Sequence, residues 1–199
     1  MKNLKSNFLL IIILISFFTT TTVIAQFTGK MKFTYMDKVR TFNVYFSNDG
    51  YRYDFDENGQ KGAVIVKKDS KEVIILMPQQ KMAMKSAPGN PMSMANDPLQ
   101  SFEYYKDSGL FKDAGEETVN GIPCNKSILY NKDNPSQKMF TMWYSNEYKF
   151  PMKMINHIDG SEDSGMEMID VKPWKPDPSM FEIPSGFNVM DMPTMPSNK

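Results

Sequence analysis

The sequence has one cysteine and one histidine among its 199 residues. A single cysteine excludes a disulfide within the chain and a multi-cysteine zinc site. A single histidine excludes two-histidine metal ligation and leaves little for histidine-based acid–base catalysis. The 23 basic residues balance the 23 acidic ones, so the chain has no field with which to hold a polyanion. We therefore predict a non-enzymatic protein with no metal, no other cofactor and no nucleic-acid partner.

Only one apolar run is long enough to direct targeting, and it lies at the amino terminus. Two lysines precede the run Phe8–Phe18, and the segment closes on the small residue Ala25, as in a signal peptide. We predict a signal peptide over residues 1–25, a mature chain that begins at Gln26, and export across the inner membrane to the periplasm or the extracellular space. An uncleaved anchor is the alternative, although the run is shorter than the roughly 20 residues that span a bilayer. No other run approaches that length, so we expect no transmembrane segment in the mature chain.

The mature chain alternates apolar and polar residues, which is typical of β-strands with one buried face. The alternation is strict over Phe27–Tyr35, and turn signals such as Ser47–Gly50 separate the apolar segments. Further strands are expected at residues 42–46, 51–55, 63–66, 73–77, 118–119, 124–130, 138–144, 152–158 and 166–171. The pattern predicts a mainly β, antiparallel domain over residues 26–189, followed by a flexible tail over residues 190–199.

One stretch in the middle of the chain breaks the strand pattern. Residues 86–96 are rich in Pro, Gly, Ser and Asn and predict a loop. Asp97 then offers a helix cap, Leu99 and Phe102 follow at helical spacing, and Gly109 can end the helix. About ten strands fit a sandwich, a closed barrel or a half-barrel. A helix inserted midway favours a strongly curved sheet whose open apolar face is covered by one or two short helices.

Six segments that span nearly the whole mature chain carry a family resemblance. They are FTGKMKFTYM, YRYDF, VIILMPQQKMAM, ETVNGIPCNK, MWYSNEYKFPMKM and DPSMFEIPSGF. Together they resemble an uncharacterised family of secreted bacterial domains of unknown function that is related to the periplasmic lipoprotein carriers LolA and LolB. The resemblance implies a curved antiparallel half-barrel, helices that close its mouth, and a hydrophobic cavity for acyl chains. It also implies a lipid or an acylated protein as the partner.

The candidate binding site is the concave apolar face of this sheet. A curved sheet with large apolar residues on its concave side must be filled by its own side chains or hold a ligand. We expect a pocket of a few hundred cubic ångströms, whereas an interior filled to normal packing density would favour a structural envelope protein without a ligand. The expected lining residues are Phe33, Phe42, Val44, Met152 and Met154 on the sheet and Phe102 on the helix.

Methionine is abundant, with 18 residues, and many lie two positions apart. In a strand this spacing puts both thioethers on one face. Three interpretations stay open: a methionine-rich core, the wall of an adaptable ligand cavity, and copper(I) capture by soft thioethers. The pairs are Met82/Met84, Met92/Met94, Met152/Met154, Met166/Met168 and Met190/Met192.

Three further side chains have a structural and a functional interpretation. We expect Cys124 to be a small buried side chain rather than a nucleophile, because a catalytic thiol needs a base and the one histidine is the only imidazole available. Trp143 and Trp174 are candidates for the rim of the pocket, although plain packing explains them equally well.

Overall fold

The computed structural model describes residues 26–35, 38–57, 59–87, 90, 99–100, 109–158 and 164–193. These ranges contain strands and two short 3-10 turns, η1 (Pro78–Gln80) and η3 (Pro178–Phe181). The strands are β1 (Phe27–Tyr35), β2 (Lys38–Ser47), β3 (Gly50–Glu57), β4 (Gln60–Lys67), β5 (Val73–Met77), β6 (Met82–Ser86), β7 (Gly109–Val119), β8 (Ile122–Asn131), β9 (Lys138–Ser145), β10 (Phe150–Asn156), β11 (Gly165–Pro173) and β12 (Asn188–Asp191).

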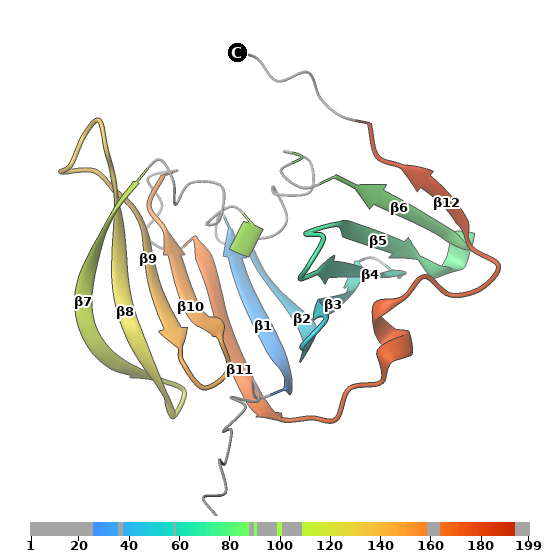
Figure 1. The fold of residues 1–199 in the computed structure, drawn as a ribbon, viewed down its shortest axis with the longest axis horizontal. Helices are drawn as coiled ribbons and strands as arrows, with labels where there is room; N and C mark the ends of the chain where they lie inside the picture. The colour runs from blue at the N-terminus through green and yellow to red at the C-terminus, as the bar shows by residue number, and fades with distance from the viewer. Residues whose placement is uncertain are drawn as a thin grey trace, which may run out of the picture.

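All of these strands belong to one sheet, in the order β12-β6-β5-β4-β3-β2-β1-β11-β10-β9-β8-β7. Neighbouring strands are antiparallel except β12, which runs parallel to β6. Figure 1 shows that the sheet is strongly curved and open, with β7 at one edge and β12 at the other. The prediction of a mainly β protein built on a curved antiparallel sheet is therefore confirmed.

Strand β1 shows why the sequence forms this sheet. Its bounds coincide with the predicted strand, and its burial alternates: Phe27 and Met31 are buried, whereas Lys30 and Lys32 are exposed. The apolar residues lie on the face that carries the larger core cluster, which we call the inner face. Burial of a large apolar side chain contributes about 1.5–3 kcal/mol, so this alternation fixes which face of β1 points inward.

Aromatic rings fill one end of the inner face. Phe27 stacks on Phe46 at 5.1 Å between ring centroids, and Phe150 meets both rings edge-on at 5.5 and 5.4 Å. Tyr148 and Tyr51 complete the group, at 5.2 Å from Phe27 and 5.7 Å from Phe150, respectively. We call these five residues the aromatic plug, because they close the interior where β1 begins.

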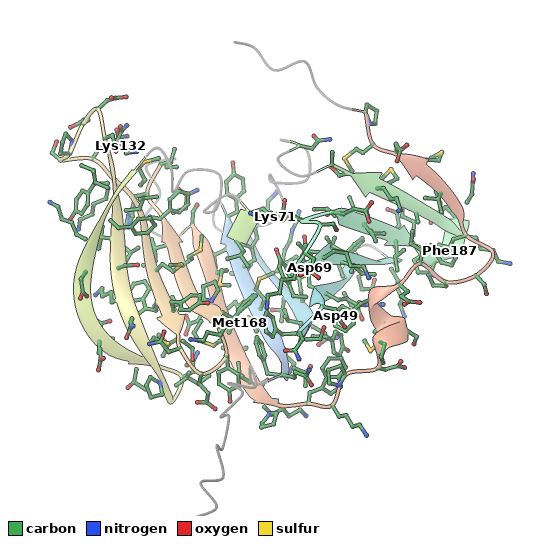
Figure 2. The ribbon with its side chains drawn as sticks, viewed as in Figure 1. Asp49, Asp69, Lys71, Lys132, Met168 and Phe187 are labelled. Atoms are coloured by element: carbon green, nitrogen blue, oxygen red, sulfur yellow. The ribbon has the colours of Figure 1, made fainter. Side chains whose placement is uncertain are left out.

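A segment beyond β11 covers the opposite, outer face of the sheet. Residues 174–187, which we call the strap, cross β3 to β6 and pack a second core cluster (Figures 1 and 2). Strand β4 is consequently buried on both sides: Val64 faces the inner cluster and Ile65 the outer one. This double burial explains why the strand reads as an uninterrupted apolar run rather than an alternation.

The strap is anchored by one buried ring and several polar contacts. Phe181 is 2% exposed, and the Arg52 guanidinium donates to the backbone oxygen of Met180 at 2.8 Å. The Asp177 carboxylate accepts from the backbone nitrogen of Ser179 at 3.0 Å and so caps η3. The strap therefore contains a single capped turn.

A last strand, β12, follows directly after the strap. Strand β12 pairs with β6, and Met192 beyond it is 8% exposed. The boundary that we placed between residues 189 and 190 thus falls inside a strand, because backbone pairing with β6 continues to Asp191.

The predicted helix needs a correction at its end. Leu99 and Gln100 are helical, whereas Asp97 and Phe102 lie outside the described residues, as do residues 1–25. Gly109 does not end a helix but begins β7, where its missing side chain leaves room for Leu129 on β8. Apart from Leu99 and Gln100, no covering α-helix is found in the part of the chain that the structure describes.

Candidate functional site

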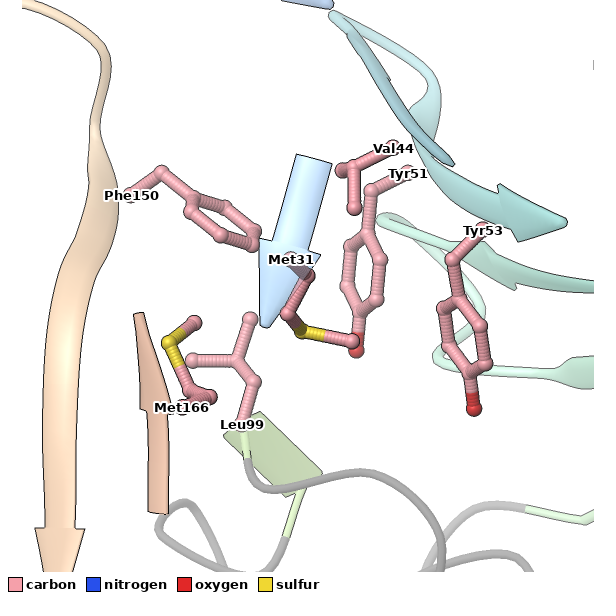
Figure 3. Close-up of a pocket in the computed structure, with 7 residues that line it drawn as sticks. All are labelled: Met31, Val44, Tyr51, Tyr53, Leu99, Phe150 and Met166. Atoms are coloured by element: carbon pink, nitrogen blue, oxygen red, sulfur yellow. The ribbon is translucent and has the colours of Figure 1, made fainter. Parts of the chain in front are cut away.

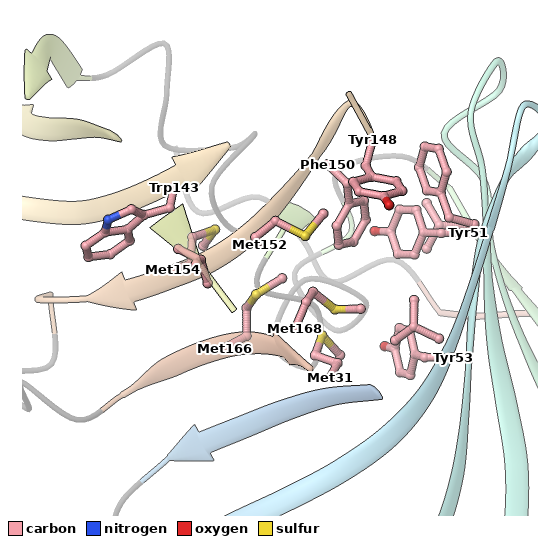
Figure 4. Close-up of a cluster of buried hydrophobic side chains, with 14 of the residues drawn as sticks. Met31, Tyr51, Tyr53, Trp143, Tyr148, Phe150, Met152, Met154, Met166 and Met168 are labelled. Atoms are coloured by element: carbon pink, nitrogen blue, oxygen red, sulfur yellow. The ribbon is translucent and has the colours of Figure 1, made fainter. Parts of the chain in front are cut away.

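Methionines form the layer next to the aromatic plug. Cross-strand pairing puts Met154 beside Met166, and Met166 beside Phe33 on β1. In the next row, Met168 pairs with Met31. Figure 4 shows these side chains between the plug and the far end of the strands. The inner cluster contains six buried methionines among the described residues: Met31, Met139, Met152, Met154, Met166 and Met168.

A small apolar pocket lies within this layer (Figure 3). Its volume is about 10 Å³, which is room for about one water molecule. It is far smaller than the few hundred cubic ångströms that we expected, because methionine and aromatic side chains fill the interior around it. This result favours the structural alternative over a preformed lipid cavity. The pocket is lined by Met31, Val44, Tyr51, Tyr53, Leu99, Phe150 and Met166.

The predicted lining residues have different positions around this pocket. Val44 is one of its lining residues. Met152 and Met154 are buried in the same core cluster at 0% and 2% exposure, and Phe33 and Phe42 pack against that cluster as partly buried side chains. Phe102 lies outside the described residues.

Six pocket residues were absent from our predicted set, although the sequence carried a signal for most of them. Met31 precedes Phe33 by two positions and therefore shares its face. Tyr51 and Tyr53 alternate with charged residues in the same manner, and Met166 belongs to a methionine pair. Leu99 was expected on the covering helix. Phe150 follows a turn, with no alternation before it to indicate its face.

Exposed apolar side chains gather at the end of the sheet opposite the plug, which we call the rim. Strands β1 and β10 end there, and β2 and β7 begin there, because neighbouring strands run antiparallel. Between 38% and 54% of each of these side chains is exposed. The rim residues are Tyr35, Val39, Leu110, Phe111 and Ile158.

The two tryptophans lie away from the rim, so that interpretation of them is wrong. Trp143 is 7% exposed, and its indole nitrogen donates to the Glu117 carboxylate at 2.6 Å. The ammonium groups of Lys126 and Lys153 lie 4.9 and 5.3 Å from its ring centroid. Trp174 packs on the outer face, 5.4 Å from the Tyr45 ring.

Hydrogen bonds and an ion pair hold together a cluster of Trp143, Glu117 and Lys126. Lys126 donates to Glu117 at 2.6 Å, and this bond, followed by the one from Trp143, holds the pKa of the Glu117 carboxyl below its ordinary value. The contacts join β7, β8 and β9, so they tie the edge hairpin to the rest of the sheet. Their role is structural, because every polar group of the cluster has a partner inside it.

The described residues give no support to catalysis or to copper binding. Cys124 is 3% exposed, as expected, and burial raises the pKa of its thiol, which opposes thiolate formation. No group of three or more His, Cys, Asp or Glu side chains that could hold a metal is found in the described ranges. Met82 and Met84 pair with β5 and β12 as half-buried strand residues, and Met92 and Met94 lie outside the described residues.

A search for membrane-crossing helices within the described ranges finds none of sufficient length and apolarity.

Comparison with known proteins identifies the family. A family model described as "Domain of unknown function (DUF4412)" matches residues 27–149, from β1 to the turn before β10. This confirms the resemblance to an uncharacterised family. No curated protein matches the sequence.

Solved structures resemble the fold at low sequence identity. An uncharacterized conserved protein from Thermus thermophilus shares 10% identity at a TM-score of 0.55, over 86% of this chain and 93% of that one. A LolA superfamily protein from Nitrosomonas europaea aligns at a TM-score of 0.41 with 10% identity, over 81% of this chain and 91% of that one. The Pseudomonas aeruginosa MucA/MucB complex aligns at 0.42 with 11% identity, over 85% of this chain and 59% of that one. Identities this low are informative about the fold alone.

Proposed function

We propose, for this chain, which belongs to the DUF4412 family of domains of unknown function, that its inner face binds the apolar chain of a lipid-like ligand without catalysing a reaction. The observation that carries the proposal is the layer of six buried methionines between the aromatic plug and the rim. Methionine has three rotatable bonds and a polarizable thioether, so a methionine layer can repack around chains of different shape.

The pocket is too small to hold a ligand chain as it stands, so the proposal requires side chains to move. A ligand chain has to displace side chains that now fill the interior, and Leu99 is the lining residue best suited to move. It is partly buried, and it reaches the pocket from a helical segment rather than from the sheet (Figure 3). The ligand therefore replaces the contacts that Leu99 makes with the inner cluster, and the sheet keeps its shape.

Truncation of this side chain tests the proposal. We expect Leu99→Ala to bind a pyrene-labelled C16 fatty acid about 3–10-fold more tightly than the unmodified protein, because the ligand no longer competes with a leucine side chain. Fluorescence titration of the probe measures the change. Leu110→Ala is the matched control, since it removes the same atoms from a side chain that is 43% exposed at the rim.

Two results would contradict the proposal. Either no saturable binding of the probe is seen with any of the three proteins, or the two variants change its affinity equally. The second result would indicate non-specific adsorption to exposed apolar surface.

The residues of the rim favour a lipid or an acylated protein as the ligand whose acyl chain binds the inner face. Its exposed apolar residues lie at the end of the strands opposite the plug, where a partner would meet the inner face. Lys38 and Arg40 are exposed beside Val39 at this end of β2, so apolar and cationic groups alternate there. This combination suits a surface with apolar chains and anionic head groups.

We further propose that the protein acts outside the inner membrane, in the periplasm or the extracellular space. The support is the sequence pattern of residues 1–25, which has the basic start, apolar run and small closing residue of a signal peptide. A purely structural role is the alternative, which the filled interior favours and which failure of the ligand titration would bring forward.

A further inference from the structure

One buried hydroxyl near the rim has no hydrogen-bond partner. Ser164 is 2% exposed, and its Oγ is the one buried side-chain nitrogen or oxygen without a partner within the described residues. Leaving a buried polar group unpaired is costly, and native proteins keep such groups rare. The hydroxyl therefore calls for an explanation from its surroundings.

Backbone pairing places this hydroxyl on the inner face. The β10–β11 ladder pairs Ile155 with Gly165, and the nitrogen of Asn156 then donates to the oxygen of Ser164 at 2.7 Å, which extends the ladder by one pair. Alternate residues of a strand share a face. Ser164 consequently lies on the side of Met166 and Met168, between the methionine layer and the rim.

The backbone around Ser164 is held firmly. A side chain on Gly165 would run into the backbone oxygen of Met154, so glycine is required for β10 and β11 to lie at their observed separation. Pairing with Asn156 fixes the backbone of Ser164, so a ligand loses less free energy in aligning its hydroxyl than it would at an unpaired residue.

We propose that the Ser164 hydroxyl is the head-group site of the inner face and hydrogen-bonds the acyl oxygen of an amphipathic ligand. The assignment rests on the proposed function, because it places the polar end of the same ligand whose chain enters the methionine layer. A serine hydroxyl donates one hydrogen bond and accepts two, so it suits a carboxyl or ester oxygen. Burial strengthens such a bond relative to one in water.

The distance from Ser164 to the methionine layer agrees with the length of a lipid acyl chain. The four residue steps from Ser164, just before β11, to Met168 span about 13 Å. One leaflet of a bilayer has a hydrocarbon depth of roughly 15 Å, half of the 30 Å core. A chain held at Ser164 by its acyl oxygen would therefore cross the methionine layer and end near the aromatic plug.

Three pyrene-labelled probes of equal chain length test the assignment: a fatty acid, its methyl ester and the alkane without a polar head. We expect Ser164→Ala to weaken binding of the acid, the ester or both by about 5–15-fold and to leave the alkane unchanged. Loss for the acid alone identifies a free fatty acid as the ligand class, and loss for both probes identifies an acyl ester.

Thermal unfolding of the unliganded protein supplies a second readout. Removing an unsatisfied hydroxyl should leave the Tm of Ser164→Ala unchanged or raise it by about 2–4 °C. The matched control is Ser47→Ala, because Ser47 is equally buried but donates to the Gly50 oxygen at 3.4 Å and accepts from the Asp49 nitrogen at 3.1 Å. We expect this control to lower the Tm and to leave all three affinities unchanged.

The outcomes separate this assignment from the proposed function. Equal affinities of Ser164→Ala and the unmodified protein for the acid and the ester would overturn the head-group site while leaving chain binding intact. A lowered Tm for Ser164→Ala would also overturn it, since the hydroxyl would then stabilise the fold. Failure of all three probes to bind the unmodified protein would overturn the proposed function, and the head-group site with it.

Discussion

Truncation of Phe181 should destabilise the protein more than any other change in the strap. The ring is 2% exposed and packs in the outer cluster with Ile65, Ile74 and Leu76. Replacing a buried phenylalanine by alanine costs about 3–5 kcal/mol, because transfer energy is lost and a cavity remains. We expect the upper half of this range, since paired strands form the floor of the cluster and cannot collapse into the space.

Urea unfolding followed by circular dichroism measures this loss. With a slope of about 2 kcal/mol/M, the midpoint of Phe181→Ala should fall by about 2–2.5 M. Phe187→Ala is the matched control, because Phe187 lies in the same strap but is only partly buried, and we expect it to cost about 1–2 kcal/mol. A loss below about 1 kcal/mol for Phe181→Ala, or equal losses for the two variants, would refute the claim that the strap belongs to the core.

Two further predictions concern acid sensitivity and the amino terminus. In a Trp174→Phe background, Trp143 emission should change as the pH falls through the pKa of Glu117, which lies below the ordinary value of a glutamate. Protonation removes the stabilising bonds of the carboxylate to Lys126 and Trp143, which are present at neutral pH. Glu117→Gln should abolish this step, and an unchanged titration in that variant would refute the assignment. The intact mass of protein exported by a bacterial host should match a chain that begins at Gln26, and a mass that still includes residues 1–25 would rule out the signal peptide.

Strands with one solvent-exposed and one buried face could be predicted from the sequence. Strands whose two faces do not differ in burial could not. Strand β1 was predicted to the residue, because its lysines and threonines alternate with apolar side chains. In contrast, only residues 118–119 of β7 were recognised. Nine consecutive residues of β7 are exposed, so it is held by pairing with β8 at the sheet edge and carries no hydrophobic pattern. The parallel pairing of β12 depends on the path of the strap, which local sequence does not encode.

Residues of the candidate site could likewise be predicted only where alternation along a strand reveals its buried face. Val44 was predicted, because it alternates with polar residues on a strand whose buried face is evident. Tyr51 was missed although its alternation with charged residues was visible, and Phe150 was missed because no alternation before it indicates its face. The unpaired hydroxyl of Ser164 has no sequence signature at all, since a serine beside a turn is ordinary.

The central position of β1 has a consequence for folding. β1 pairs with β2 on one side and with β11 on the other, so Phe33 meets Met166, a residue 133 positions later in the chain. Until residues 165–173 have been synthesised, one edge of β1 stays unpaired and the methionine layer has only part of its walls. Contacts between residues so far apart in sequence slow folding and prolong the exposure of unpaired strand edges, which can aggregate. A chain that stops before β11 would therefore contain two half-sheets, β1 to β6 and β7 to β10, each with an apolar face open to aggregation.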